Sequence, residues 1–184
     1  MVVDEPFDQI LDAVRVGVCD AAVSAVTITP ERAEQVDFSQ PYLEVGQSLV
    51  VRSEQGTVAS LADLSPRTVG VQAGTTGERF VEANRPAGLR ILDYPSTEDQ
   101  FAALRSGQVT GIVLDSPVAD VAVADDPGLR VAVGFDTDEQ YGIAVARDDA
   151  ETLAVIERGL EQARADGTLD GLRQRYLGPA ANGS

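Results

Sequence analysis

The fold is decided by residues 68–84, TVGVQAGTTGERFVEAN. The valines of 68–72 predict a buried strand, and the glycines that follow predict a tight turn. Thr75 and Glu78 stand at capping-box spacing, so we expect a helix over 76–84. A strand, a turn and a helix in this order form the repeating unit of a sheet that helices cover.

The same alternation continues on both sides of this stretch. Downstream, we expect strands at 91–94, 110–115, 130–135 and 141–146, and helices at 98–105, 117–124, 150–165 and from 168 to 176. Upstream, we expect a helix at 6–16, a strand at 21–26, a short helix at 31–35, a turn at 38–42 and a strand at 47–52. This order predicts an α/β protein with a parallel, doubly wound sheet. The tail GPAANGS, residues 178–184, is predicted to be disordered.

The composition excludes several classes of function. The chain has 184 residues and a formal charge of −16, from 30 acidic and 14 basic residues, so its surface repels nucleic-acid phosphates. It contains no histidine, and all its basic residues are arginine. The usual general base, the Schiff-base lysine, the P-loop lysine and most zinc sites are therefore missing. We expect no metal, no cofactor and no enzymatic activity.

The sequence says little about the compartment. No apolar run approaches the ~20 residues of a membrane span. The N-terminus, MVVDE, lacks the basic region of a signal peptide. The single cysteine, Cys19, cannot form an internal disulfide and is most simply a small buried hydrophobe.

Arg32 is the first candidate binding residue. It falls in the first turn of the helix that Thr29 and Pro30 begin, where the helix dipole disfavours a cation by ~0.3–1 kcal/mol. One interpretation is a surface arginine that pairs with Glu31 or Glu34. The other is a guanidinium that leaves the strand-to-helix junction and binds a carboxylate in a bidentate manner.

The turn at 74–77, GTTG, is the second candidate. A glycine-rich turn that begins a helix leaves main-chain N–H groups for an anion, although most such turns are only tight turns with a capped helix. It lacks the lysine and the spacing of a Walker motif, so a small carboxylate suits it better than a phosphate.

Asp115 is the third candidate, at the carboxyl end of the strand 110–115, where open α/β sheets bind ligands. It could cap the next helix. However, Pro117 favours the first helical position, which makes Ser116 the expected cap and leaves Asp115 to bind an ammonium group. Phe7 lies on the apolar face of its helix, so core packing is the default interpretation for this ring.

Together these stretches resemble a known family. The runs AVTITPER (25–32) and VDFSQPY (36–42) are similar to the signature of polar amino-acid solute-binding proteins of ABC importers. The segments VGVQAGTTG (69–77), GIVLDSP (111–117), QYGIAV (140–145) and DGTLDGLRQRYLG (166–178) match in the same order. The resemblance spans nearly the whole chain.

The resemblance implies a two-lobed fold of the type II periplasmic-binding class, each lobe a mostly parallel sheet flanked by helices. Lobe one would be 1–50 plus 140–184 and lobe two 55–136, with hinge crossings at 51–54 and 137–139. An amino acid would bind reversibly between the lobes as the hinge closes. The protein would work outside the cytoplasm, in the periplasm or lipid-anchored at the outer face of the membrane, and deliver its ligand to an ABC permease.

The resemblance also implies a role for each site residue. Arg32 would bind the α-carboxylate of the ligand, with the N–H of Thr76 and its neighbour Thr75. Asp115 would bind the α-ammonium group, with the carbonyl of Ala25 and the hydroxyl of Thr27 beside it. Two further residues would face the ligand side chain: Phe7 as a wall of the pocket and Gln72 at its variable end.

The chain departs from the family pattern at its start. A strand, a helix and a second strand that precede the helix at 6–16 in the family have no counterpart here, a difference of about 30 residues or more, the size of a βαβ unit. We therefore expect lobe one to be truncated and to expose sheet edges, which a homodimer could cover. Two other functions stay open: a ligand-sensing module of a receptor, and an enzyme similar to cyclohexadienyl dehydratases.

Overall fold

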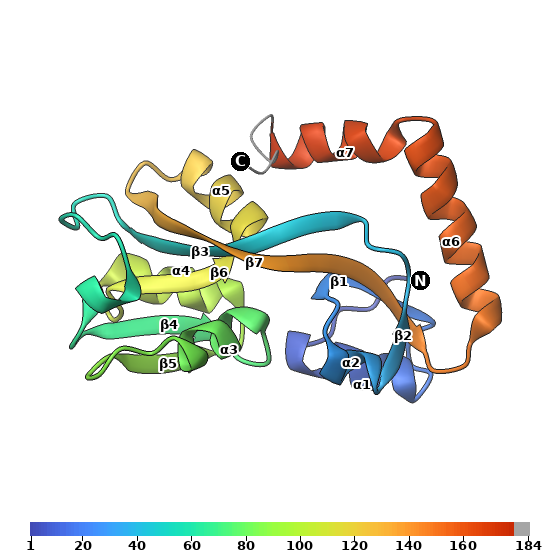
Figure 1. Ribbon diagram of the computed structural model, residues 1–184, viewed down its shortest axis with the longest axis horizontal. Helices are drawn as coiled ribbons and strands as arrows, with labels where there is room; N and C mark the ends of the chain where they lie inside the picture. Colours follow the sequence, from blue (N-terminus) through green and yellow to red (C-terminus); the bar gives the residue numbers. More distant parts are fainter. Residues whose placement is uncertain (179–184) are drawn as a thin grey trace. The chain divides into compact units, whose positions relative to one another are not determined.

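The computed structural model describes residues 1–178 and divides into two units (Figure 1). Unit 1 combines Met1–Val45 with Asp138–Ser184, and unit 2 is Gly46–Thr137. The predicted lobe boundaries and hinge crossings stay a prediction. The tail that was predicted to be disordered lies, from residue 179 onward, outside the described residues.

Unit 2 alternates strands with helices. Its elements are β3 (Leu43–Arg52), η2 (Leu61–Leu64), β4 (Thr68–Gln72), α3 (Thr76–Ala83), β5 (Arg90–Tyr94), α4 (Thr97–Ser106), β6 (Gly111–Asp115), α5 (Ser116–Asp125) and the first part of β7 (Leu129–Ala146). Figure 1 shows β4 between β5 and β6, and β4 is parallel to both. β3 pairs with β6 in the antiparallel direction. The α/β class is confirmed, but the sheet is mixed and not parallel as expected, because β3 runs antiparallel to β6.

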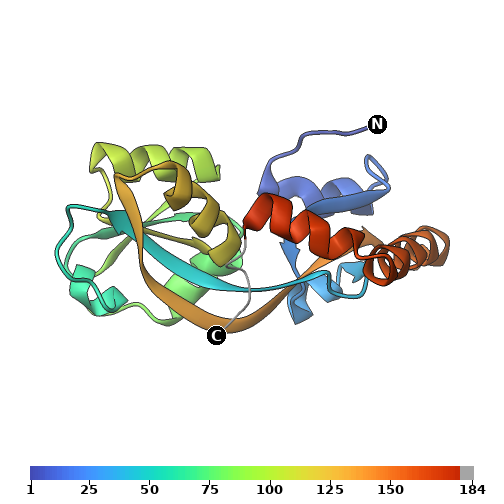
Figure 2. The same cartoon turned by 90° about the horizontal axis from the view of Figure 1, so that it is seen from above.

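The two faces of this sheet carry separate apolar clusters. Successive residues of a strand point to opposite faces. Leu49 and Val51 of β3 therefore pack with residues of α3 and η2, whereas Val50 packs with residues of α4 and α5. Figure 2 shows these two pairs of helices on opposite faces of the sheet. All three side chains are fully buried. Helices thus cover both faces of the unit 2 sheet, as the alternation of elements predicts.

Unit 1 contains a smaller core. Its elements are η1 (Phe7–Gln9), α1 (Ile10–Arg15), β1 (Ala21–Thr27), α2 (Pro30–Ala33), β2 (Val36–Phe38), the end of β7, α6 (Ala150–Ala165) and α7 (Thr168–Leu177). β1 and β2 both pair with β7 in the antiparallel direction. Ile10 and Val14 of α1 pack against Val26, Val36 and Ala144 of these strands.

The two C-terminal helices contribute little to this core. Neither α6 nor α7 contains a buried residue, and Val155, Leu172 and Tyr176 expose 57%, 45% and 61% of their surface. Polar contacts attach the helices to the segment 40–42: Glu157 accepts from Gln40 N (2.6 Å), Arg164 donates to Pro41 O (2.6 Å) and Arg173 donates to Tyr42 O. These helices are thus attached to the rest of unit 1 mainly by polar groups.

Two predictions about the strands are wrong. The strands expected at 130–135 and 141–146 form one 18-residue strand, β7, which includes the polar stretch Asp136–Gln140. A strand needs only main-chain pairing, as where Ile28 N donates to Gln140 O at 2.8 Å, so polar side chains do not end it. The segment 36–38, for which no strand was expected, forms β2, and its three residues pair with the end of β7.

Candidate functional site

Arg32 is held in unit 1 by a short helix that its own neighbours begin. Thr29 occupies the N-cap of α2, and its hydroxyl accepts from Arg32 N at 3.2 Å; Pro30 takes the first helical position. The guanidinium donates from Nη1 to Thr27 O at 2.8 Å. Only 5% of Arg32 is exposed, so the interpretation of it as a surface arginine is wrong.

Phe7 also contacts this guanidinium. The Cζ atom of Arg32 lies 5.6 Å from the centre of the Phe7 ring, within the range of a cation–π contact. Phe7 is half-buried and also packs against the apolar core of unit 1. The prediction that this ring packs in the core is therefore confirmed. We call Phe7, Ala25, Thr27 and Arg32 the unit 1 cluster. An arginine keeps its charge when buried, and its five N–H donors suit a carboxylate.

Ala25 lies where β1 is irregular. The pairing of β1 with β7 shifts register between Ala22 and Val26, and Ala25 has a φ of +52°. A bulge of this kind re-aims the groups beside it, and the left-handed backbone costs an alanine about 1–2 kcal/mol. Burial raises the pKa of Tyr42, and a hydrogen bond with the backbone of Ala25 partly offsets the rise. The backbone of the bulge at Ala25 is therefore hydrogen-bonded to Tyr42, which also belongs to unit 1.

Asp115 belongs to a second group of polar residues, in unit 2. Gln47 donates from Nε2 to Asp115 Oδ1 at 2.7 Å, and the same nitrogen lies 3.3 Å from Thr76 Oγ1. Gln47 is fully buried, and its Cα is paired with that of Asp115 across β3 and β6. We call Gln47, Thr76 and Asp115 the unit 2 cluster. The unit 1 cluster thus contains a cation, the guanidinium of Arg32, and the unit 2 cluster contains an anion, the carboxylate of Asp115.

Gln47 was missed in the sequence. It begins the run QSLVVR (47–52), whose later residues predict a buried strand. A buried amide needs hydrogen-bond partners, so a glutamine in such a strand is a signal of a polar site. The sequence contained this signal, but it did not show that the partner is Asp115, because that depends on how β3 pairs with β6.

The capping of α5 differs from the prediction. The helix begins at Ser116, so Asp115 rather than Ser116 is at the N-cap, and the Asp115 side chain makes no cap hydrogen bond. Ser116 Oγ instead accepts from Gly46 N at 3.1 Å. Pro117 can take the second helical position because the first N–H groups of a helix have no partner within it. The Asp115 carboxylate is bound by Gln47, and not by its own helix.

Several polar groups of the glycine-rich turn form hydrogen bonds with the end of the strand before it or with the helix that follows it. Thr75 Oγ1 accepts from Glu78 N (3.2 Å) and donates to Gln72 O (2.8 Å). The Glu78 carboxylate accepts from Gly74 N at 2.7 Å, one residue before the partner that a capping box has. Of the two threonines predicted to bind the ligand, Thr76 is therefore brought to Asp115 through Gln47, whereas the hydroxyl of Thr75 holds the turn.

Gln72 is placed at a different part of unit 2. Its Nε2 donates to Pro95 O at 3.2 Å, and its Oε1 accepts from Thr97 Oγ1 at 2.9 Å. Both contacts fix the connection between β5 and α4, and neither involves the unit 2 cluster. The role of Gln72 at the variable end of a ligand stays a prediction.

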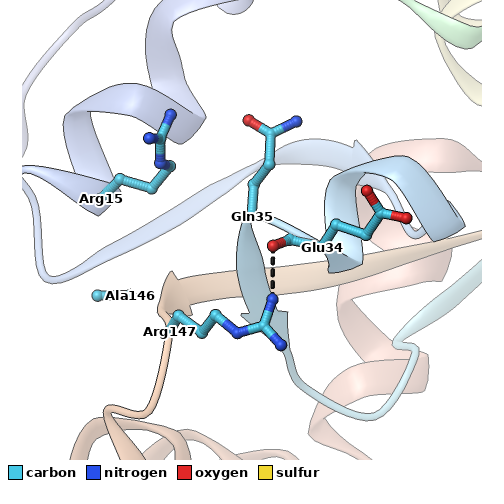
Figure 3. Close-up of a pocket in the computed structure, with 5 residues that line it drawn as sticks. All are labelled: Arg15, Glu34, Gln35, Ala146 and Arg147. Carbon is cyan, nitrogen blue, oxygen red and sulfur yellow. Dashed lines mark hydrogen bonds between the residues drawn. The ribbon is translucent and has the colours of Figure 1, made fainter.

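A cavity of about 430 Å³ lies elsewhere in unit 1 (Figure 3). It is lined by Arg15, Glu34, Gln35, Ala146 and Arg147. Arg147 Nη1 donates to Glu34 O at 2.5 Å, and Arg15 Nη1 pairs with Asp12 Oδ1 at 2.5 Å. Both arginines thus have acceptors on α1 or after α2, and the cavity includes none of the predicted site residues.

Residues 1–178 contain neither a metal-binding cluster nor a membrane-spanning helix. No group of three or more His, Cys, Asp or Glu residues there is arranged to hold a metal ion. No helix in this range combines the length and the apolar character that crossing a membrane requires.

The sequence matches known proteins over almost its full length. It is 31% identical over 176 residues to the ABC transporter arginine-binding protein 1 of Escherichia coli K12, covering 93% of this chain and 71% of that protein. It is 30% identical over 184 residues to the L-arginine-binding protein of Pseudomonas aeruginosa, covering 95% and 71%.

Solved structures give the same result. An ancestral arginine-binding protein bound to arginine matches with a TM-score of 0.88 and 37% identity, covering 95% of this chain and 78% of that one. The holo form of ArgBP from T. maritima matches with a TM-score of 0.82 and 34% identity, covering 94% and 77%. Residues 1–179 also match the sequence profile of a protein family, the bacterial extracellular solute-binding proteins, family 3. The chain therefore belongs to family 3 of the bacterial extracellular solute-binding proteins, whose type II periplasmic-binding fold it shares.

Proposed function

We propose that the protein reversibly binds a free amino acid and delivers it to the permease of an ABC importer. The observation that carries the proposal is the pair of clusters: a buried guanidinium in unit 1 and a carboxylate fixed by a buried amide in unit 2. A zwitterionic amino acid needs one group of each sign. Arg32 binds the α-carboxylate, and Asp115 binds the α-ammonium group.

Each cluster supplies further groups for the same ligand. The N–H of Thr76, in the first turn of α3, supports the carboxylate, because the start of a helix favours an anion. The carbonyl of Ala25 and the hydroxyl of Thr27 support the ammonium group, and Phe7 packs against the ligand side chain. Since the two charged groups belong to different units, the ligand favours the state in which both contact it. Micromolar affinity, about −8 kcal/mol, suits two charge-assisted contacts and one desolvated side chain.

Among amino acids, L-arginine is the first candidate. The relatives named above are arginine-binding proteins by name, and one solved relative holds arginine. Another match is an ancestral arginine-binding protein bound to glutamine, so L-glutamine is the second candidate. The formal charge of −16 also favours a cationic ligand, because it raises the concentration of cations near the surface.

The place of action is outside the cytoplasm, in the periplasm or at the outer face of the cell membrane, by analogy with the family. There the protein binds rather than transforms its ligand. The dehydratase alternative predicts turnover of prephenate, and the receptor alternative predicts ligand binding without transfer to a permease.

A thermal-shift panel of the twenty amino acids tests the proposal. A ligand at a hundred times its Kd adds ~2.7 kcal/mol to the free energy of unfolding. For a chain of this length that raises Tm by roughly 5–10 °C. We expect a shift with L-arginine, or with one or two other polar amino acids. A protein that melts cooperatively and shifts with none of the twenty contradicts the proposal, and prephenate turnover would then favour the enzyme.

We also propose a homodimer through unit 1. Within residues 1–178, β1 pairs with β7 on one side only, and Val23 of this edge strand is 66% exposed. An edge strand is a template for pairing with another chain. Light scattering should therefore give twice the chain mass, and Val23→Lys should restore the monomer without changing ligand affinity. A monomer at every concentration contradicts the dimer and leaves the binding proposal intact.

A further inference from the structure

We infer that Gln47 is a positioning residue, which orients the Asp115 carboxylate for the ammonium group of the ligand. The inference rests on the proposed function, because it assigns Gln47 a role that acts through Asp115. The sequence signature of the resemblance does not include this residue, and none of the roles carried over from the family falls on it.

The geometry leaves the Gln47 amide little freedom. Its Nε2 has two N–H donors, and two acceptors lie within hydrogen-bond distance of it: Asp115 Oδ1 at 2.7 Å and Thr76 Oγ1 at 3.3 Å. Gln47 thus links two parts of the candidate site. One is Asp115, which is expected to bind the α-ammonium group of the ligand, and the other is the start of α3, which is expected to bind the α-carboxylate of the ligand. A fixed side chain has less conformational entropy to lose when a ligand binds.

The surrounding backbone is shaped to admit this amide. At Gly77, in the first turn of α3, a Cβ atom would lie 2.9 Å from Gln47 Oε1. Next to Gln47, Gly46 N donates to Ser116 Oγ, so two consecutive residues of β3 hold the junction of β6 and α5. The cross-strand pairing of Gln47 with Asp115 keeps both on one face of the sheet.

Stability alone does not explain a glutamine at this position. The next buried positions of β3 are mostly apolar, and an apolar side chain of the same shape there costs no desolvation of an amide. The glutamine is explained by the carboxylate that it binds. Gln47 therefore differs from an ordinary buried polar residue.

The chain offers a matched control in Gln100. This glutamine is also fully buried in unit 2, but its Nε2 donates to the main-chain oxygens of Gly70 (3.0 Å) and Val113 (2.8 Å). Its hydrogen bonds therefore join α4 to β4 and β6, and do not touch a candidate ligand group. Gln100→Leu should lower Tm and leave ligand affinity within about twofold.

The test is a double-mutant cycle with L-arginine as the probe, measured by titration calorimetry and, for weak binders, by NMR titration. Gln47→Leu should raise Kd about tenfold, the loss expected when a rotamer-rich side chain must be immobilised on binding. In an Asp115→Ala background the same substitution should change Kd by less than twofold, because the side chain that Gln47 orients is gone. Gln47→Asn keeps the polarity, draws the amide back by one methylene group and should behave like Gln47→Leu.

The outcomes separate the inference from the function on which it rests. If Asp115→Asn weakens binding but Gln47→Leu and Gln47→Asn do not, the inference is wrong and the proposed function stands. The inference is also wrong if Gln47→Leu raises Kd by the same factor in both backgrounds. If Asp115→Asn leaves Kd unchanged, or L-arginine and the other amino acids do not bind, the proposed function fails and the inference with it.

Discussion

The two clusters hold their charges by opposite means. In unit 1, a main-chain oxygen and an aromatic ring contact the guanidinium of Arg32, which belongs to a helix of a single turn. In unit 2, a side-chain amide fixes the carboxylate of Asp115, at a helix start that favours an anion. The cation is thus contacted by main chain and a ring, and the anion by a side chain that a substitution can remove.

The largest effect should come from Arg32→Ala. The buried carboxylate of the ligand would lose its charged partner, so L-arginine should bind ~2–5 kcal/mol more weakly. Arg32→Lys keeps the charge but not the planar fork and should recover part of the loss. Titration calorimetry measures both. Agmatine, which lacks the carboxylate, should bind the parent protein and Arg32→Ala equally, and an unchanged affinity for L-arginine in Arg32→Ala would contradict the assignment.

Asp115→Asn should have the second largest effect. The amide keeps an acceptor for Gln47 but loses the charge, so a charge-assisted hydrogen bond becomes neutral and binding weakens by about 1.5–3 kcal/mol. The same titrations test it. An arginine analogue with hydrogen in place of the α-amino group should not distinguish Asp115→Asn from the parent protein. If it does, the carboxylate acts on another part of the ligand.

Gly77→Ala should sharpen the comparison, because it should weaken binding without weakening the fold. The new Cβ meets Gln47 Oε1 at 2.9 Å, at the flexible end of a side chain that can move aside. Alanine is also the better helix former by about 0.5–1 kcal/mol. We therefore expect Kd to rise several-fold while Tm stays level or increases. A fall in Tm with unchanged Kd would mean that the space at Gly77 serves packing alone.

The smallest effect on binding should come from Thr29→Ala. It removes the cap of α2 and should lower the free energy of unfolding by about 1 kcal/mol, with a change in Kd of at most a few-fold through Arg32. Ser96→Ala is its control in unit 2, since Ser96 caps α4 in the same way. Urea unfolding should give similar losses for both, and only Thr29→Ala should alter Kd. Equal Kd values would show that the α2 cap does not affect the guanidinium.

The sequence predicted most elements, since their signals are local. The caps at Thr29 and Thr75 were read from spacing and are confirmed by their hydrogen bonds. The helix expected over 98–105 is also confirmed as α4, which ends at Gly107, a left-handed residue with a φ of +81°. The continuous β7 was missed, because its polar middle is extended through pairing with distant residues.

The candidate site was predicted in part for the same reason. Arg32 and Asp115 were identified from their places at a helix start and a strand end, which are properties of nearby sequence. Gln47 was not, because its hydrogen bond to Asp115 joins residues 68 positions apart. The side-chain contacts of Gln72 with Pro95 and Thr97 also depend on how β4 and β5 pair. Side-chain contacts between residues on different strands were therefore the part of the site that the sequence did not predict.

The chain order of the two units has a consequence for synthesis on the ribosome. Unit 2 is one uninterrupted segment, whereas unit 1 is made from two segments on either side of it. β1 and β2 find their pairing partner only at Tyr141–Ala146, the end of β7. A chain growing at about 5–20 residues per second therefore completes unit 2 while both strands still wait for that partner. During those seconds β1 and β2 lack the strand with which they pair in the folded unit 1.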